Sequence, residues 1–346
     1  MRHQKVERIE GGVWSLPVPI PDNPLGYTLV YLIETDAGPV LIDAGWHSPA
    51  GIEALEAGIT EAGFDIADVH GVAVTHCHPD HNGLSGEVRD RSGAWVAIHV
   101  ADAAVVRGQV EWQSAEGSDR SERWRRTLVE AMHAAGAPDD EVEAMFAHQA
   151  SMTVAVPPLP DRTFEDGELL DVPGRTLRSV WTPGHSPGHS CFHLEDSQRV
   201  FAGDHLLPTI TPHVGLYESA GPTDDPLGEF LASVRRVADL RPVEVLPAHE
   251  YRFDSAADRA AEILDHHEER LRQVEESVDA GETLWDITAA MQWNRPWEQI
   301  APMMRRIALS EAHAHVRHLE MRGRIAPVED PLPPTYRRPT RWARVR

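Results

Sequence analysis

Cysteine is scarce in this sequence of 346 residues, which contains only Cys77 and Cys191. A small secreted domain held by a disulfide framework is therefore excluded, and a reducing cytosol is the expected compartment. Long apolar runs are absent too: no stretch reaches the roughly 18 residues of a membrane-spanning helix, so we expect no membrane partner. The N-terminal residues lack the apolar core of a signal peptide, which also favours a cytoplasmic protein.

Positive charge is scarce as well. The formal net charge is −23, and residues 331–346 hold five arginines and no acidic residue, so the rest of the chain carries −28. A field of that sign repels polyanions and makes nucleic acid an unexpected partner. We expect residues 331–346 to be a basic tail, either solvated or docked on the acidic body or on a partner.

The most informative segment that is present is residues 76–81, with the sequence HCHPDH. It holds three histidines and one aspartate in six positions, directly after the apolar residues 72–74. Imidazole and carboxylate together are typical ligands of Zn, Fe or Mn. Four such side chains in one short loop predict two metal ions rather than one, because paired ions are a common hydrolytic device.

Other ligand-type residues stand where further strand-like runs end. His185, Asp204 and His249 each follow an apolar run, and Asp43 does the same upstream. Ligands supplied from strand ends along one edge are how α/β folds build sites, so we expect these side chains to converge.

These motifs, in this order, resemble the metallo-β-lactamase superfamily over about residues 10–250. The resemblance implies an α/β fold, the four-layer αβ/βα sandwich, in which helices cover the outer faces of two sheets. It is closer to the two-metal hydrolytic members (glyoxalase II, lactonases, processing nucleases) than to the one-metal or cysteine-liganded β-lactamases. The ligands it implies are His76, His78 and His185 for one ion, Asp80, His81 and His249 for the other, and Asp204 as the bridge.

The expected cofactors are two divalent metal ions, with Zn²⁺ as the first expectation and Fe or Mn as alternatives. A hydroxide that bridges two cations is a strong nucleophile at neutral pH. Asp80 binds metal and also orients the hydroxide, which makes it the expected catalytic residue. Asp43 is interpreted as a hydrogen-bond acceptor for a ligand histidine.

Several nearby residues have more than one interpretation. Cys77 alternates away from its histidine neighbours in an extended segment, so we expect a buried thiol. His189 competes with His185 but is interpreted as a hydrogen-bonded support. His205 either contacts the substrate or a ligand, or is an ordinary loop histidine. His213 or Tyr217 could donate a hydrogen bond to the oxyanion or leaving group. Histidines 266, 267, 313, 315 and 318 are expected on the surface or in a satisfied interior.

The chain divides into three expected parts. Residues 1–255 form the catalytic domain, with a helical insert at about 101–150 whose Trp112 and Trp124 either line an acyl pocket or pack the insert onto the body. Residues 256–330 form a linking helix and a winged-helix-like domain, which resembles a module appended in one branch of the superfamily. Residues 283–330 carry six basic and six acidic residues, so packing, homodimerisation or pocket closure is favoured over DNA binding.

The predicted function is therefore a dinuclear metal-dependent hydrolase that cleaves a small acyl ester, thioester or lactone. The alternative is a phosphodiesterase or endoribonuclease, since some relatives with a similar appended domain cleave RNA; the net charge opposes it. A non-catalytic metal-binding or DNA-binding regulator is disfavoured by the complete ligand set. Hydrolysis of β-lactams is not expected without a secretion signal.

Overall fold

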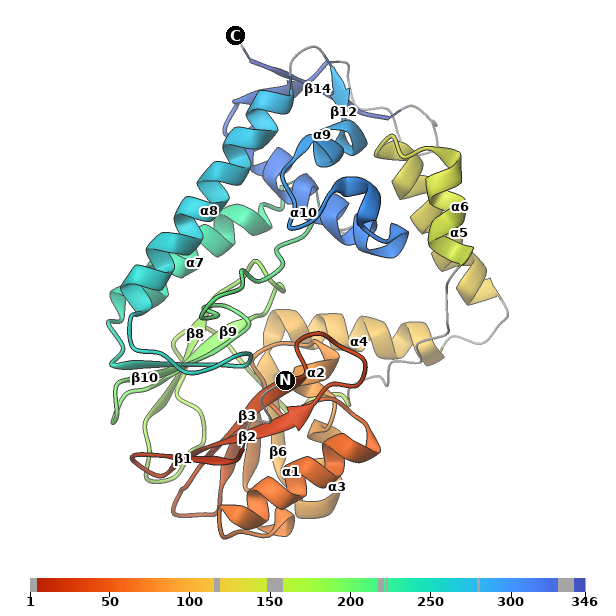
Figure 1. The fold of residues 1–346 in the computed structure, drawn as a ribbon. Helices are drawn as coiled ribbons and strands as arrows, with labels where there is room; N and C mark the ends of the chain where they lie inside the picture. The colour runs from red at the N-terminus through yellow and green to blue at the C-terminus, as the bar shows by residue number, and fades with distance from the viewer. Residues whose placement is uncertain are drawn as a thin grey trace. The chain divides into compact units, whose positions relative to one another are not determined.

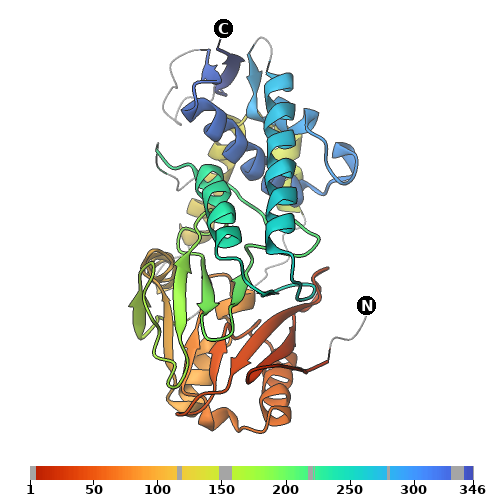
Figure 2. The same ribbon diagram turned by 90° about the vertical axis from the view of Figure 1, so that its left-hand side faces the viewer.

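The computed structural model describes residues 5–114, 119–147, 158–216, 221, 223–278, 281–328 and 339–345. They form two compact units, and the division falls within helices α7 (Pro226–Asp239) and α8 (Ala256–Ser277) (Figure 1, Figure 2). Among the described residues, no helix combines the length and the apolar character that crossing a membrane requires. Unit 1 comprises Met1–Ser114, Val154–Pro212 and Ala232–Ala261, and unit 2 comprises Ala115–Thr153, His213–Leu231 and Glu262–Arg346.

The larger sheet of unit 1 has seven strands that follow one another in chain order. Strands β1 to β4 pair antiparallel and strands β4 to β7 pair parallel. The carboxyl ends of β4, β5 and β6 therefore meet at one edge. The strands are β1 (Glu7–Ile9), β2 (Val13–Pro19), β3 (Tyr27–Ile33), β4 (Val40–Ile42), β5 (Gly71–Ala73), β6 (Trp95–His99) and β7 (Arg162–Phe164).

The smaller sheet of unit 1 has four strands in the order β11-β10-β9-β8. Strands β10 and β11 run parallel, and the other neighbours are antiparallel. The loops after β8, β10 and β11 carry the three downstream ligand candidates. The strands are β8 (Leu177–Trp181), β9 (Ser190–Leu194), β10 (Arg199–Gly203) and β11 (Glu244–Pro247).

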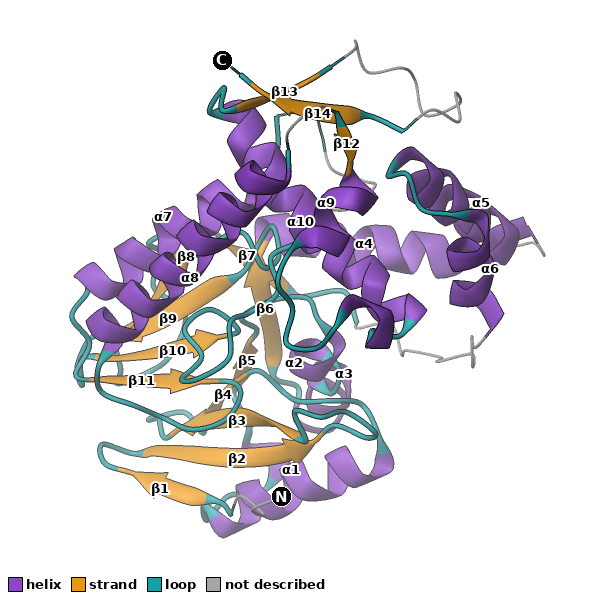
Figure 3. Ribbon diagram, turned by 45° about the horizontal axis from the view of Figure 1, so that its top comes forward, coloured by secondary structure: helices purple, strands orange, loops and turns teal. Residues whose placement is uncertain are grey.

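Side chains alternate between two apolar cores, as strand geometry requires. Tyr31 faces the core between the two sheets, where its ring centroid lies 5.3 Å from that of Phe201. Its neighbours Val30 and Leu32 point to the opposite face, which helices cover (Figure 3). The helical segments on the larger sheet's side are α1 (Pro49–Glu61), the 3-10 turn η1 (Ile66–Asp68), α2 (Pro79–Asn82), α3 (Ser85–Ser92) and α4 (Val100–Ser114).

Unit 2 is mostly helical. It contains α5 (Asp119–Ala134), α6 (Asp139–Ala147), α9 (Leu284–Ala290), the 3-10 turn η2 (Trp297–Gln299) and α10 (Pro302–Met321). A small antiparallel sheet has the order β12-β14-β13, from strands β12 (Glu282–Thr283), β13 (Ile325–Pro327) and β14 (Arg341–Arg344). Thr283 caps α9 through a capping box with Asp286, which explains why the helix begins there.

The α/β metallo-β-lactamase-type sandwich predicted from the sequence is confirmed. The domain boundaries stay a prediction, although two segments differ from expectation. The helices of the expected 101–150 insert do not share one unit, because α4 belongs to unit 1 whereas α5 and α6 belong to unit 2. Residues 341–344 of the expected basic tail form β14, in which Trp342 is buried, so deleting them would remove a strand.

Candidate metal centre

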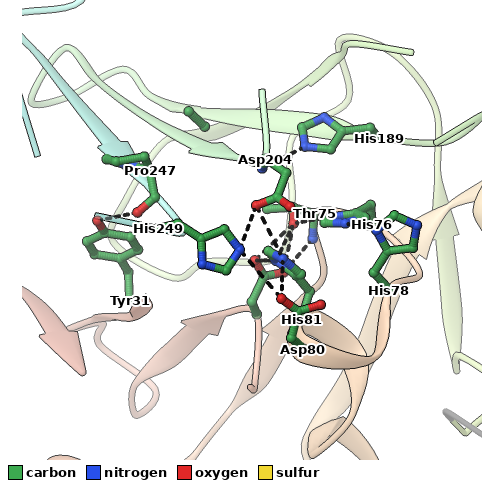
Figure 4. Close-up of polar contacts among 12 residues, drawn as sticks. Tyr31, Thr75, His76, His78, Asp80, His81, His189, Asp204, Pro247 and His249 are labelled. Atoms are coloured by element: carbon green, nitrogen blue, oxygen red, sulfur yellow. Dashed lines mark hydrogen bonds and ion pairs between the residues drawn. The ribbon is translucent and has the colours of Figure 1, made fainter. Parts of the chain in front are cut away.

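Three overlapping groups of side chains in unit 1 could hold metal ions, each with its ligand atoms within 4.8 Å of one another. Figure 4 shows side chains from the 76–81 loop pointing toward Asp204 and His249. All seven residues predicted as ligands belong to these groups, which are His76, His78 and His185 (the three-histidine group), Asp80, His81 and His249 (the mixed group), and His76, His81 and Asp204.

The backbone of residues 76–81 explains how one short segment serves two groups. His78 is extended and forms the N-cap of α2, and Pro79 occupies the first turn. Proline fits there because its fixed φ suits a helix start and its missing N–H would be unpaired anyway. His76 and His78 thus precede the helix, whereas Asp80 and His81 lie within it. That change of conformation separates the two pairs and directs them to different groups.

The three-histidine group brings three ring nitrogens together. His185 Nε2 lies 3.2 Å from His76 Nε2 and 3.0 Å from His78 Nδ1, and the last two atoms are 2.9 Å apart. The Thr75 hydroxyl lies between the Asp43 carboxylate and His76 Nδ1. Because it donates to the carboxylate, it accepts from His76 Nδ1–H, which leaves the His76 Nε2 lone pair facing the other rings.

Hydrogen bonds orient His81 and His249 of the mixed group in a similar way. His81 Nδ1 lies 2.8 Å from Asp43 Oδ2, and His249 Nδ1 lies 3.0 Å from the carbonyl oxygen of Tyr27. Both contacts engage Nδ1, so the Nε2 atom of each ring faces the mixed group. Metal-binding histidines have this arrangement, with the second nitrogen donating to a carboxylate or carbonyl.

The Asp204 carboxylate faces both groups. Its Oδ1 lies 3.4 Å from His81 Nε2 and 3.1 Å from His249 Nε2, whereas its Oδ2 lies 3.5 Å from His185 Nε2. Asp80 Oδ2 approaches the same two nitrogens of the mixed group at 3.6 and 3.5 Å. Among the described residues, His81 Nε2, His249 Nε2 and Asp204 Oδ1 are buried and have only these ion-pair contacts, with no partner in hydrogen-bond geometry. A donor set of this composition fits divalent transition metals.

The two groups differ in electrostatics. Burial lowers the pKa of His76 well below its ordinary value, and burial with a contribution from His185 lowers that of His78 to about 3. Burial opposes protonation of His249 as well, but Asp204 and Asp80 outweigh it and raise its pKa to about 10. His76 and His78 are therefore neutral at pH 7, whereas an ion binding to the mixed group would displace a proton.

Asp43 supports the mixed group through its hydrogen bond with His81. It is buried and accepts hydrogen bonds from the Thr75 backbone N–H at 2.7 Å, from the Thr75 hydroxyl and from His81. Its φ of +63° is uncommon for a residue with a side chain, and such conformations concentrate at functional sites. The contact with His81 is the one expected from the sequence.

His189, Cys77 and His205 are not members of the three groups. His189 Nε2 accepts the backbone N–H of Asp204 at 3.1 Å, and its Nδ1 lies 2.8 Å from Thr182 Oγ1, so it supports Asp204 as expected. Cys77 is a buried thiol, and burial and then the charge of Asp102 raise its pKa well above the usual value. His205 is also buried, with Nε2 2.8 Å from the Ser233 hydroxyl.

Other predicted contacts lie outside this cluster or outside the described residues. His213 belongs to unit 2, where its Nε2 lies 3.2 Å from the Ser310 hydroxyl. Tyr217 lies outside the described residues. Trp112 and Trp124 belong to different units and are 39% and 37% exposed, so their role in an acyl pocket stays a prediction.

The supports that sequence reasoning missed are Thr75, Thr182, Ser186 and Asp102. Thr75 and Ser186 are the chain neighbours of ligand candidates, which is a usable signal. Asp102 stands in the first turn of α4 and has no motif around it.

Comparisons with known proteins agree with this geometry. The family model described as "Metallo-beta-lactamase superfamily" matches residues 23–249. A metallo-beta-lactamase family protein of known structure from Thermus thermophilus has a TM-score of 0.75 and 31% identity, covering 96% of this chain and 99% of that one.

Two curated relatives are similar over smaller shares. The lactamase-like protein adaB of Aspergillus niger is 26% identical over 251 residues, which cover 71% of this chain. This chain spans only 57% of that relative's length. The atrochrysone carboxyl ACP thioesterase of Aspergillus fumigatus is 31% identical over 109 residues, which cover 32% of this chain and 31% of that protein.

Proposed function

This chain belongs to the metallo-beta-lactamase superfamily, a family of hydrolases, and from that premise we propose that it is a two-metal acyl hydrolase acting on a small ester, thioester or lactone. The observation that carries the proposal is the position of Asp204, whose two carboxylate oxygens face different groups of histidines. A carboxylate so placed is suited to bridge two ions.

The residues divide the work in this proposal. His76, His78 and His185 would hold one ion, and Asp80, His81 and His249 would hold the other. Two divalent ions, Zn²⁺ first and Fe or Mn otherwise, would generate hydroxide at neutral pH and polarise an acyl carbonyl. Asp43, His189 and the Tyr27 carbonyl fix ring or carboxylate orientation by the hydrogen bonds described above.

Asp80 is the proposed catalytic residue. Burial would raise its pKa, but His81 and His249 hold the pKa at about 2, so the group is a carboxylate at any working pH. As an acceptor it can orient the proton of an attacking water. It lies in the first turn of α2, directly after Pro79, whose fixed φ suits the helix start.

Two observations support an acyl substrate. The thioesterase of Aspergillus fumigatus shows that one similar protein acts on a thioester, over an aligned third of this chain. The net charge of −23 disfavours the alternative, an endoribonuclease or phosphodiesterase.

The C-terminal part is proposed to be a winged-helix-like module without a DNA-binding role. The support is the order β12, α9, α10, β13 and β14, with the β13–β14 pair completing a three-stranded antiparallel sheet. A homodimer and a cytoplasmic location remain parts of the proposal, and size-exclusion chromatography with light scattering tests the first.

The function is tested by a substrate screen on purified full-length protein, with metal content measured in parallel. The panel holds acyl thioesters, aryl esters, lactones, a phosphodiester and short single-stranded RNA. An acyl compound should be turned over fastest, and Asp204→Asn should remove that activity. Metal-dependent cleavage of RNA that is faster than any acyl turnover would refute the proposal in favour of the nuclease.

A further inference from the structure

We propose that Asp102 is a positioning residue that holds together the two loops carrying the three-histidine group, and thereby sets the metal affinity of that group and not of the mixed group. The inference rests on the proposed two-ion site. It assigns a role to a buried carboxylate that lies outside every metal-ligating group of the described residues.

Asp102 contacts both loops at once. Its Oδ2 accepts the Cys77 backbone N–H at 2.8 Å and the Ser186 hydroxyl at 2.8 Å, and its Oδ1 accepts the Gly188 backbone N–H at 2.6 Å. Cys77 lies between His76 and His78 in the chain, and Ser186 follows His185. One carboxylate therefore ties the backbone of the first loop to the second.

Hydrogen bonds offset the cost of burying the side chain of Asp102. The residue has 0% exposure, and within the described chain no arginine, lysine or histidine forms an ion pair with it. A buried carboxylate is costly unless its lone pairs are used. Here backbone and hydroxyl donors use them, and charge-assisted bonds of this kind are short and strong.

Gly188 shows how closely the second loop is drawn in. A Cβ added to it would lie 2.4 Å from the backbone nitrogen of Asp102 and 2.7 Å from its Cβ. Any other residue at this position would push the loop away from α4. The close approach places His185, three residues earlier, against His76 and His78.

The mixed group has separate support. His81 donates to Asp43 at 2.8 Å, and His249 donates to the Tyr27 carbonyl at 3.0 Å. Neither residue contacts Asp102. Asp43 reaches both groups, through His81 directly and through Thr75 to His76, whereas Asp102 contacts only the loops of the three-histidine group. Changing Asp102 should therefore leave the affinity of the mixed group intact.

The test is Co²⁺ binding to metal-free full-length protein, followed by the visible spectrum of the bound ion and by elemental analysis. Two backgrounds isolate the groups, since His249→Ala retains the three-histidine group and His185→Ala retains the mixed group. Asp102→Asn keeps the size of the side chain but turns one acceptor into a donor facing an N–H or O–H. Asp225→Asn is the matched control, because Asp225 likewise combines a backbone donor, the Gly228 N–H, with a side-chain partner, His318, but lies in unit 2.

In the His249→Ala background, Asp102→Asn should weaken Co²⁺ binding by about 10- to 100-fold, the usual effect of losing an outer support, and should change the spectrum. In the His185→Ala background the change should stay within about 2-fold, as expected for independent sites. Asp225→Asn should change neither. Unaltered affinity and spectrum in the first background, or equal losses in both, overturn the inference.

If Asp102→Asn does not fold, Ser186→Ala decides the matter, because it removes one of the three donors. It should weaken Co²⁺ binding to the three-histidine group by about 5-fold, equivalent to one hydrogen bond, and no change overturns the inference. The outcome is separable from that of the proposed function. A protein that binds two Co²⁺ ions with the predicted sensitivity but hydrolyses no acyl compound refutes only the function.

Discussion

Buried histidines gather in both units of this molecule, and they are organised differently. In unit 2, His267 Nδ1 lies 3.1 Å from His315 Nε2, and His315 Nδ1 lies 2.8 Å from the Glu311 carbonyl. His318 Nδ1 lies 2.8 Å from Asp225 Oδ2. The contacts run from His267 through His315 to Glu311, and separately from His318 to Asp225, without converging on one region. In the described part of unit 2, no three ligand atoms lie within 4.8 Å of one another.

The cluster of unit 1 is convergent instead. The outer nitrogens of His76, His81 and His249 are taken up by hydrogen bonds to their supports, and the inner nitrogens face a common region with Asp204. Burial and proximity are common to the two units. What distinguishes the candidate metal site is that ligand atoms of several side chains face one region.

The largest effect that tests this comparison is metal removal. Chelation should abolish hydrolysis, and Zn²⁺, Mn²⁺ or Fe²⁺ should restore it, because the proposed reaction requires ions held by the cluster of unit 1. With metal bound, activity should rise with pH through one apparent pKa near 7, the value of water on such ions. Elemental analysis should give two equivalents per chain. Full activity in protein shown to be free of metal would contradict the assignment.

The next effect is that of matched aspartates in the two units. Asp204→Ala should lower activity by more than the roughly 100-fold that an outer support costs, and should reduce the affinity for both ions, because its two oxygens serve both groups. Asp225→Ala removes a histidine partner in unit 2 and should keep two equivalents of metal. His249→Ala should fall between them and keep one. Equal metal loss in the two aspartate variants would show that metal binding does not depend on the position of Asp204 between the two groups.

The sequence predicted the convergent cluster well because its signal is local. Residues 76–81 place four ligand-type side chains in one turn, and strand ends of an α/β fold meet at one edge. The same reasoning discounted the histidines of unit 2, which lie on helices α8 and α10 and bond to partners there.

What the sequence could not predict depends on contacts between distant segments. Asp102 is 25 residues from Cys77 and 84 from Ser186. An aspartate in the first turn of a helix is usually explained by its favourable interaction with the helix dipole, so nothing in the sequence points to these contacts. Trp342 is buried through pairing of β14 with two strands remote in the chain, which an arginine-rich composition conceals. The division of the 101–150 helices between units is likewise set by tertiary contacts, not by local pattern.

A smaller effect is expected from acid in unit 2, where Glu311 pairs with Arg270. Burial would raise the pKa of Glu311, but His213 and Arg270 hold it well below its ordinary value. A lowered carboxyl pKa stabilises the fold above the unfolded-state pKa of about 4.3, and the contribution is lost as pH falls through that value toward the folded pKa. Wild-type unfolding free energy should therefore fall below about pH 5.

The matching variant is Glu311→Gln. At pH 7 it should lose about 3 kcal/mol, because the nearly buried Arg270 would keep its charge without its carboxylate partner. Its stability should then depend less on pH between about 5 and 3 than that of the wild type. Chemical denaturation across this pH range measures both, and parallel pH curves for the two proteins would show that Glu311 does not carry the acid sensitivity.

The smallest effect should come from substituting Cys77, which tests whether the thiol between His76 and His78 belongs to the metal site. Its thiol is of a metal-binding type and its chain neighbours are His76 and His78, yet it is 4% exposed and packs in the core beneath the larger sheet. Cys77→Ala removes a weak thiol contact with Asp102 but keeps the backbone N–H that Asp102 accepts, so metal content and most of the activity should be retained. Loss of a small buried side chain should cost about 1 kcal/mol in denaturant unfolding. A variant that loses one metal equivalent would instead mean that the thiol, not only its backbone, belongs to the site.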